Sequence, residues 1–267
     1  MPIRLDASFR EQLAASDRSL IGMWACSGSA IVTEVAAGSS LDWLLIDMEH
    51  SANSLESVLL QLQVAAAYPI APVVRVPSND TVAIKQVLDL GAQNIIVPMV
   101  SSADEARAAV AATRYPPEGV RGVGSALARS ARWNRVDRYL QESAAHTSLT
   151  VQIETAAGVD AAAEIAAVDG VDAVFVGPSD LSASMGLLGQ QTHPDVVAAV
   201  ERVFAAVKAA GTAVGVNAFD PTAADGYIAA GADFVAVGAD VALLARASEG
   251  LASRFIPVSD DTRRASY

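Results

Sequence analysis

The sequence predicts a single-domain (β/α)8 barrel over residues 1–267, in which eight parallel strands alternate with helices. Eight short apolar segments rich in β-branched residues recur, at 19–25, 42–47, 72–77, 94–99, 149–154, 172–177, 212–217 and 233–238. Ala-rich stretches with helical spacing lie between them, for example 83–92, 103–114, 195–211 and 225–232. Near-continuous apolar strands, each followed by a helix, are typical of a parallel sheet covered on both faces.

An open, doubly wound sheet is the alternative architecture for this pattern of strands and helices. Dinucleotide-binding sheets of that kind carry a G-x-G-x-x-G turn after the first strand, and no such motif follows residues 19–25. No Pro/Ser-rich linker divides the chain, whose length fits one barrel of about 250 residues. The longest segment between strands, 99–148, exceeds an ordinary loop, which indicates a functional role.

Composition limits the partners of the protein. A net charge of −12 disfavours nucleic acid, which needs a basic footprint. No apolar run approaches the 18 residues needed to span a membrane, and the first 17 residues lack the apolar core of a signal peptide, so we expect a cytoplasmic protein. One cysteine, Cys26, excludes an internal disulfide and metal clusters built from several cysteines. Small molecules and protein subunits are the expected partners.

Polar residues gather where the expected strands end. They are Asp47, Glu49, His50, Arg75, Gln152, Glu154, Asp180 and Asn217. A barrel would bring all of them to one mouth, at the carboxyl ends of its strands, where active sites of this fold lie. The alternative for any one of the carboxylates is capping of the next helix, and Asp180 in GPSDLS is the most open to that interpretation.

The run VQIET at 151–155 indicates a metal site. Gln152 and Glu154 share one face of a strand, because residues two apart point the same way. A buried carboxylate needs a partner, and the carboxylates of Glu154 and Asp180 on adjacent strands suit Mg²⁺ or Mn²⁺. Gln152 would then orient a ligand beside the cation.

His50 and Arg75 are candidates for proton transfer and charge stabilisation. His50 follows a strand end, where a carboxylate can hold its tautomer, although a lone histidine is often only structural. Arg75 could stabilise an oxyanion, or form a structural ion pair with Asp47 or Glu49. The chain has only two lysines, Lys85 and Lys208, both in expected helices, which argues against Schiff-base chemistry.

Six runs resemble the metal-dependent, class II pyruvate aldolases. They are LDWLLIDMEH, PVVRVPSND, IKQVLDLGAQNIIVPMV, ATRYPPEGVRGVGSALARSARWNR, VQIET and VFVGPSDLSASMG, and the likeness covers about 18–255. The resemblance implies a (β/α)8 barrel with an ordered core over about 18–255 and a C-terminal tail at 256–267. It also implies a hexamer, built as a trimer of dimers, whose C-terminal helices are exchanged between protomers.

The resemblance implies an aldol reaction between pyruvate, or an analogue such as hydroxypyruvate, and an aldehyde. Glu154 and Asp180 would bind Mg²⁺, Mn²⁺ or Co²⁺, and Arg75 would stabilise the enolate oxygen. His50 paired with Asp89 would move protons, with Asp47 in support. The implied substrate-binding residues are Trp24, Ser125, Gln152, Gly177, Pro178, Ser179 and Asn217. Ser125 and the arginines around it would reach an adjacent protomer.

Two other functions compete with the aldolase. An acyl-CoA lyase of related architecture would need a basic patch for nucleotide phosphates, which the loop arginines Arg121, Arg129, Arg132 and Arg135 could form. A non-catalytic, ligand-binding barrel is the second alternative, and it predicts no response to divalent metal.

Overall fold

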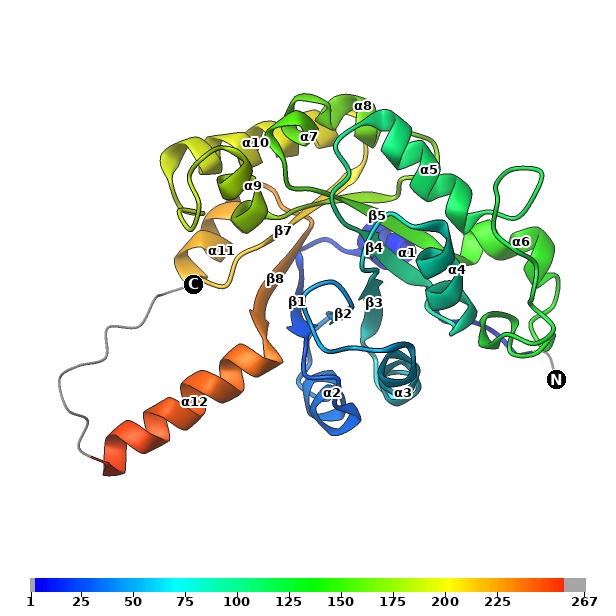
Figure 1. Ribbon diagram of the computed structural model, residues 1–267, viewed down its shortest axis with the longest axis horizontal. Helices are drawn as coiled ribbons and strands as arrows, with labels where there is room; N and C mark the ends of the chain where they lie inside the picture. Colours follow the sequence, from blue (N-terminus) through cyan, green and yellow to red (C-terminus); the bar gives the residue numbers. More distant parts are fainter. Residues whose placement is uncertain (1–2, 257–267) are drawn as a thin grey trace.

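The protein is a closed barrel of eight parallel strands, described by a computed structural model over residues 3–256 (Figure 1). The strands pair in chain order, and β8 closes the barrel against β1. They are β1 (Leu20–Ala25), β2 (Trp43–Asp47), β3 (Ala71–Arg75), β4 (Asn94–Val97), β5 (Ser148–Ile153), β6 (Ala173–Val176), β7 (Ala213–Asn217) and β8 (Phe234–Ala239). The open-sheet alternative was therefore wrong, and each expected strand is present within two residues of its predicted ends.

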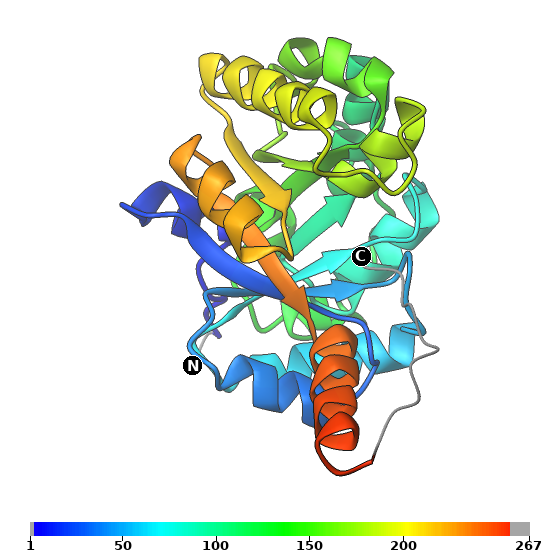
Figure 2. The same cartoon turned by 90° about the vertical axis from the view of Figure 1, so that its left-hand side faces the viewer.

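Helices cover the outside of the barrel between successive strands (Figure 2). They are α2 (Ala30–Ala37), α3 (Leu55–Ala65), α4 (Thr81–Asp89), α5 (Ala103–Thr113), α6 (Tyr139–His146), α7 (Ala156–Asp160), α8 (Ala162–Ala166), α9 (Pro178–Ser184), α10 (Pro194–Ala209) and α11 (Pro221–Ala229). The long segment between β4 and β5 holds α5, a short 3-10 helix η1 (Arg129–Ala131) and α6.

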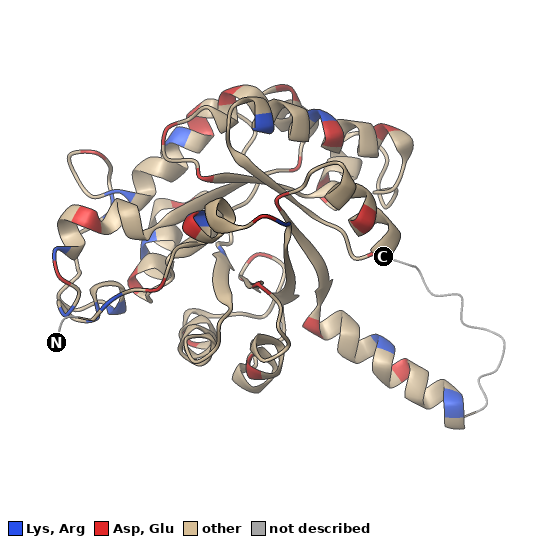
Figure 3. Ribbon diagram, turned by 180° about the vertical axis from the view of Figure 1, so that it is seen from behind, with Lys and Arg blue, Asp and Glu red and all other residues tan. Residues whose placement is uncertain are grey.

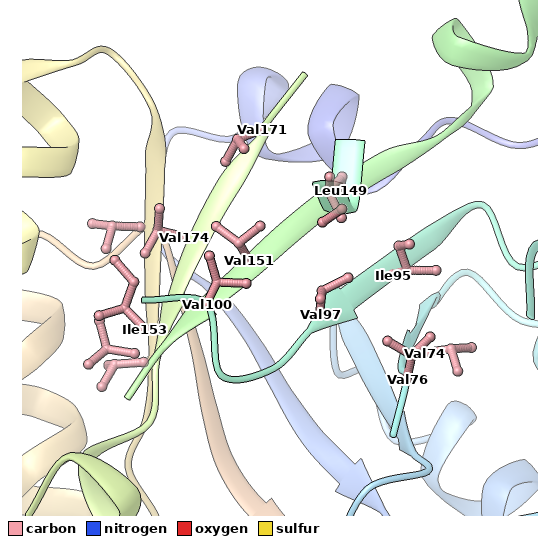
Figure 4. Packing of buried hydrophobic residues seen from close by; sticks show 14 of the residues in the cluster. Val74, Val76, Ile95, Val97, Val100, Leu149, Val151, Ile153, Val171 and Val174 are labelled. Carbon is pink, nitrogen blue, oxygen red and sulfur yellow. The ribbon is translucent and has the colours of Figure 1, made fainter. Parts of the chain in front are cut away.

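Two apolar cores lie on the two faces of the strands. The outer core fills the space between the strands and the helices, and Figure 4 shows Val74, Ile95, Val151 and Val174 within it. The inner core fills the barrel and is built around Trp43, Phe175 and Phe234. Because side chains alternate along a strand, Val151 and Ile153 point outward while Gln152 points into the barrel. Because of this alternation, the same strands can place polar side chains inside the barrel mouth and apolar side chains against the covering helices.

A short helix, α1 (Phe9–Ala15), closes the N-terminal end of the barrel. It precedes residue 18, where the ordered core was expected to begin. Phe9 enters the inner core, with its ring 5.6 Å from that of Trp43 and 5.2 Å from that of Phe234. The backbone N–H of Phe9 donates to Asn94 Oδ1 at 2.7 Å. A capping box between Ser8 and Glu11 starts the helix. The opposite end of the barrel is left open for the site.

The last helix, α12 (Asp240–Phe255), projects away from the barrel (Figures 1 and 2). Its main contacts with the barrel are with β1 and β8. Apolar side chains at Leu243, Leu244, Leu251 and Phe255 are all more than half exposed. The expected tail at 256–267 lies, except for Ile256, outside the described residues. No helix of residues 3–256 is long and apolar enough to cross a membrane.

Candidate active site

The centre of the barrel mouth is a buried cluster of charged side chains from β2 and β3. Asp47 and Arg75 occupy paired positions on these strands. Arg75 Nε donates to Asp47 Oδ1 at 2.8 Å, and Arg75 Nη1 lies 2.7 Å from Glu49 Oε2. Asp47 also accepts the backbone N–H groups of Glu49 and His50, which fixes the turn after β2. The ion pair expected for Arg75 is present, so its guanidinium has one defined orientation.

Trp24 on β1 holds the other side of the arginine. The Arg75 guanidinium lies over the Trp24 ring, 4.2 Å from its centroid. The Trp24 indole N–H donates to Asn217 Oδ1 at 2.8 Å, so strands β1, β3 and β7 are linked at the mouth. A cation over an indole face is stabilised electrostatically. Trp24 and Asn217, both expected at the site, therefore lie within it.

Glu154 follows β5 and is almost fully buried, with 2% of its surface exposed. Its Oε1 accepts the backbone N–H of Met99 at 2.8 Å, and its Oε2 accepts from Gln152 Nε2 at 2.5 Å. Gly177 makes room for this pair, because a Cβ there would lie 2.6 Å from Glu154 Oε2. Any larger residue at 177 would displace the carboxylate. Gln152 and Glu154 point the same way, as expected, although Glu154 lies one residue past the end of β5.

Burial and neighbouring charge shift the acidity of the carboxylates at the mouth. Burial raises the pKa of Glu154 to about 7, and the negative charges of Glu49 and Asp180 add to that effect. The Met99 N–H and the charge of Arg75 oppose it. The pKa of Glu49 is raised mainly by burial, against the charge of Arg75. Carboxylates that repel one another in a buried site are stabilised by a cation placed among them.

Asp180 lies beside these groups on the first turn of α9. It is exposed and makes no hydrogen bond or ion pair within residues 3–256, although its charge is felt by both Glu154 and Glu49. The capping alternative was wrong, since Gly177 is the N-cap of α9 and no side chain caps that helix. Pro178 is its buried first residue, and the Ser179 hydroxyl donates to Gln191 Oε1 at 2.8 Å. Asp180 is thus free to bind a ligand.

The donors at the mouth fit a hard divalent cation. The carboxylates of Glu154 and Asp180 supply charged oxygens. Gln152 Oε1 is a buried amide oxygen that accepts no hydrogen bond within the described chain. Leaving such an oxygen unpaired is costly, and a cation or a substrate group satisfies it. No cluster of three or more His, Cys, Asp and Glu side chains suited to a metal occurs in residues 3–256, so substrate or water would complete the coordination.

His50 stands at the rim of the mouth. Its side chain is 64% exposed, and Nε2 lies 3.8 Å from Glu49 Oε1. This position can exchange protons with solvent and with a ligand above Arg75. Of the other two histidines, His146 lies at the end of α6, away from the mouth, and His193 is the N-cap of α10.

Asp89 and Ser125 are not brought to the mouth of their own barrel. Asp89 is the last residue of α4, which begins near the mouth and ends at the opposite end of the barrel, just before β4. Its carboxylate accepts from Arg121 Nη2 at 2.9 Å. Ser125 lies nearby in the loop after α5, since a Cβ on Gly124 would be 3.9 Å from Asp89 Oδ2. The expected pairing of Asp89 with His50 is absent within one protomer.

Both lysines lie on the outer helices, Lys85 on α4 and Lys208 on α10, where Lys208 pairs with Asp233 at 3.1 Å. Arg121 is fully buried, with its guanidinium over the ring of Tyr115 at 4.7 Å. It is therefore unavailable to a nucleotide, and Arg129 and Arg132 line a cavity at the other end of the barrel. The basic patch that an acyl-CoA lyase needs is not formed at the mouth by these arginines.

Comparison with known proteins identifies the family. A model described as HpcH/HpaI aldolase/citrate lyase matches residues 20–247. The chain belongs to the HpcH/HpaI family. A 4-hydroxy-2-oxo-heptane-1,7-dioate aldolase of Salmonella heidelberg is 51% identical to it, over 93% of this chain and 94% of the relative.

Solved structures of similar proteins have the same barrel. An HpcH/HpaI family protein from Burkholderia cenocepacia is 42% identical, with a TM-score of 0.89 over 93% of this chain and 99% of that one. The citrate synthase SbnG is 29% identical, with a TM-score of 0.82 over 93% of this chain and 98% of its own.

Membership of the HpcH/HpaI family makes the protein an enzyme of the carbon–carbon lyase class, as the sequence predicted. Members of the family generally depend on a divalent metal. The resemblance to metal-dependent aldolases is confirmed as well. A non-catalytic barrel is excluded by the same finding.

The HpcH/HpaI site includes groups to which the sequence analysis assigned no catalytic or ligand-binding role. The backbone N–H of Met99 holds Glu154, and a backbone amide leaves no signal in a sequence. Glu49 was noted at a strand end, and its place between Arg75 and Glu154 makes it part of the charged cluster. Asp240 accepts the N–H groups of Cys26 and Ser27 and so fixes the loop after β1.

Proposed function

We propose that the protein is a divalent-metal-dependent aldolase that adds pyruvate, or an analogue such as hydroxypyruvate, to an aldehyde and cleaves 4-hydroxy-2-oxoacids in reverse. The observation that carries this proposal is the rigid guanidinium of Arg75 beside the buried carboxylate of Glu154. A fixed and buried cation is suited to an enolate oxygen. The name of the Salmonella heidelberg relative supports 4-hydroxy-2-oxoheptane-1,7-dioate as a substrate.

Mg²⁺ or Mn²⁺, with Co²⁺ as a substitute, is the proposed cofactor, and Glu154 and Asp180 would hold it. When bound, the cation would polarise the keto group of the donor and offset the charge of the carboxylates. Gln152 would contact the donor through its side-chain N–H group, because pyruvate offers only acceptor oxygens. Gly177 keeps the space beside Glu154 open, and Pro178 and Ser179 form the wall next to it.

The chain's own groups account for each proton and bond of the cleavage. A base takes the proton of the 4-hydroxyl, and the C3–C4 bond breaks. The electrons of that bond form the enolate of pyruvate while the aldehyde leaves. The enolate then takes a proton from water at C3 to give pyruvate, and the base returns its own proton to solvent. Arg75 stabilises the enolate oxygen. Asp47 and Trp24 hold the Arg75 guanidinium in one orientation. We assign the proton transfer to His50, which faces solvent at the rim. Asn217, held by Trp24, would face the aldehyde.

We also propose that the enzyme is a hexamer, a trimer of dimers, in which α12 is exchanged between protomers. The apolar side chains that α12 exposes, including Leu244 and Phe255, support such packing, because a patch of this kind is unusual on a monomer. Asp89 and Ser125 would then serve the mouth of a neighbouring protomer, where Asp89 would pair with His50. Light scattering should give the mass of six chains, and Leu244→Glu should lower it.

A cytoplasmic location is part of the same proposal. The chain has one cysteine, Cys26, which fits a compartment where disulfides rarely persist. Fractionation of source cells with a specific antibody should recover the protein with cytoplasmic markers. Recovery with exported proteins instead would contradict this proposal.

The decisive experiment is a cleavage assay with a choice of substrates. Chelated enzyme would be reloaded with Mg²⁺, Mn²⁺ or Co²⁺ and given 4-hydroxy-2-oxoheptane-1,7-dioate, with pyruvate release followed through lactate dehydrogenase. We expect release that requires a metal. An acyl-CoA thioester is the comparison substrate, since a thioester lyase is the remaining alternative. Turnover of the thioester without release of pyruvate from the oxoacid would overturn the proposal.

A further inference from the structure

A cavity of about 330 Å³ lies at the N-terminal end of the barrel, far from the mouth. It opens between the start of β3 at Ala71, the start of β4 at Asn94 and the segment that leads into α1. Arg129 on η1 and Arg132 just after it line its other side. Its volume is at the lower end of the range for small-molecule sites. Nothing in the aldol reaction uses this cavity.

Two guanidinium groups converge in the cavity, and neither is in an ion pair with a described carboxylate. A Cβ on Gly91 would lie 2.8 Å from Arg129 Nη1 and 2.9 Å from Arg132 Nη1, so both groups lie against the same point. Arg129 donates to the backbone oxygen of Leu90 at 3.1 Å, and Arg132 to that of Arg129 at 2.6 Å. Neither forms an ion pair with a carboxylate of residues 3–256. Figure 3 shows Lys and Arg positions, with Asp and Glu positions among them, near the N-terminus.

The charge around the pair is unbalanced. Burial lowers the pKa of Arg129 to about 10, and the charge of Arg132 contributes to that shift. Within the described residues, Asp6 is the one acidic residue that lines the cavity, and it attracts Arg132 without reaching ion-pair distance. Its side chain belongs to an exposed residue, so solvent screens its charge. Two half-buried cations held together in this way repel one another unless an anion lies between them.

We propose that this cavity binds the phosphate group of a small molecule, either free phosphate or a phosphate monoester. Guanidinium groups recognise phosphate by paired, charge-assisted hydrogen bonds, and the converging Nη1 atoms of Arg129 and Arg132 offer donors from two sides. The doubly charged anion balances the two arginines. The cavity has room beyond one phosphate group for the organic part of a small ester.

Calorimetric titration of the metal-loaded enzyme with inorganic phosphate, at constant ionic strength, tests this proposal. Because phosphate could also bind at the mouth, wild type, Arg75→Ala, Arg129→Gln and Arg132→Gln would be compared. We expect binding to survive Arg75→Ala and to weaken by about tenfold or more in each of the other two variants. Arg135→Ala, which removes an exposed arginine outside the cavity, is the matched control and should bind as wild type does. Loss of all binding in Arg75→Ala alone would overturn the proposal.

Asp6→Asn should change the affinity for phosphate in the opposite direction. A folding defect could not produce tighter binding. Removing the nearby negative charge should tighten phosphate binding about two- to fivefold. Glycerol phosphate and succinate distinguish the possible ligands. Binding of glycerol phosphate at least as tight as phosphate supports an ester as the natural ligand, and phosphate tighter than the ester supports the free anion. Succinate binding tighter than both phosphates would contradict the assignment. The assignment would also be contradicted if wild type bound no phosphate and Arg129→Gln only changed the oligomeric mass.

Discussion

Arg75 and Asp47 form a buried ion pair between paired positions of adjacent strands, with 2.8 Å between Nε and Oδ1. Their side chains are 4% and 1% exposed, so water does not screen the interaction. Such a pair adds little to the stability of the fold, because removing two charges from water offsets their attraction. Its main effect is to fix the orientation of the two side chains. Removing one partner leaves the other buried and unpaired, which typically costs about 3–5 kcal/mol. The pair therefore links the stability of the barrel to the orientation of the proposed enolate-binding group.

Arg75→Ala should reduce both cleavage of the 4-hydroxy-2-oxoacid and exchange of pyruvate methyl protons with deuterium by about 10²-fold or more, because both pass through the enolate. Arg75→Lys should restore only part of each rate, since an ammonium lacks the planar fork. NMR measures the exchange and the coupled assay the cleavage. Arg107→Ala, at an exposed arginine paired with Asp104, is the control and should retain both rates. Full exchange in folded Arg75→Ala would remove Arg75 from the enolate step.

Glu154→Gln and Asp180→Asn should each abolish metal-dependent turnover, since an amide oxygen is a poor substitute for a charged ligand. Metal titration by calorimetry should show weaker binding in both variants than in wild type. For Glu154→Gln the metal-free protein should melt no lower than wild type at pH 8. At that pH the raised pKa of Glu154 means that wild type carries an unfavourable buried charge. Wild-type turnover of either variant at saturating metal would overturn the ligand assignment.

The sequence was most informative where strand alternation decides direction. Gln152 and Glu154 were expected to share a face, and Arg75 was expected to pair with Asp47 or Glu49. The structure shows Arg75 in contact with both carboxylates. Asp89 could not be located in this way, because α4 carries it about 13 Å from the start of the helix, toward the other end of the barrel. The Met99 N–H was also beyond sequence reasoning, since it depends on a backbone turn with φ of +58°. The capping box at Ser8 and Glu11 was a readable signal for α1.

Incubation with pyruvate and borohydride should leave the enzyme active and unmodified. Reductive trapping needs a lysine at the reacting centre, and Lys85 and Lys208 lie on outer helices. Intact-mass spectrometry before and after treatment measures any adduct, with a Schiff-base aldolase as the positive control. A pyruvate adduct on either lysine would require a different mechanism.

Cys26 should be resistant to alkylation in the folded enzyme at pH 8.5. Burial raises the pKa of its thiol from 9.0 to about 12, with the charges of Asp47 and Asp240 adding to the shift. The thiolate is the reactive form, so iodoacetamide should react at least about tenfold more slowly than in urea. Because the folded state keeps a proton that the unfolded chain loses, the free energy of unfolding should fall as the pH rises above about 9. Cys26→Ser should reduce that part of the pH dependence, and equal alkylation rates in both conditions would contradict the shift.

The assignment of Asp89 to a neighbouring mouth can be tested with mixed oligomers. His50→Ala and Asp89→Asn should each be slow in cleavage when assembled alone, because the proposed proton-transfer pair is broken in every site. Mixing the two after reversible dissociation creates sites in which an intact His50 faces an intact Asp89 from the other variant.

Random mixing in equal amounts should yield about one intact site in four, and activity should rise toward that fraction of wild type. Pairing within one protomer predicts no rise, because every chain carries one of the two defects. Arg121→Lys adds a further test, since Arg121 holds the Asp89 carboxylate at 2.9 Å. That variant should slow cleavage and shift its dependence on pH while leaving pyruvate proton exchange near the wild-type rate. If the mixed oligomers stay as slow as the parent variants while their mass confirms mixing, Asp89 does not act across the interface.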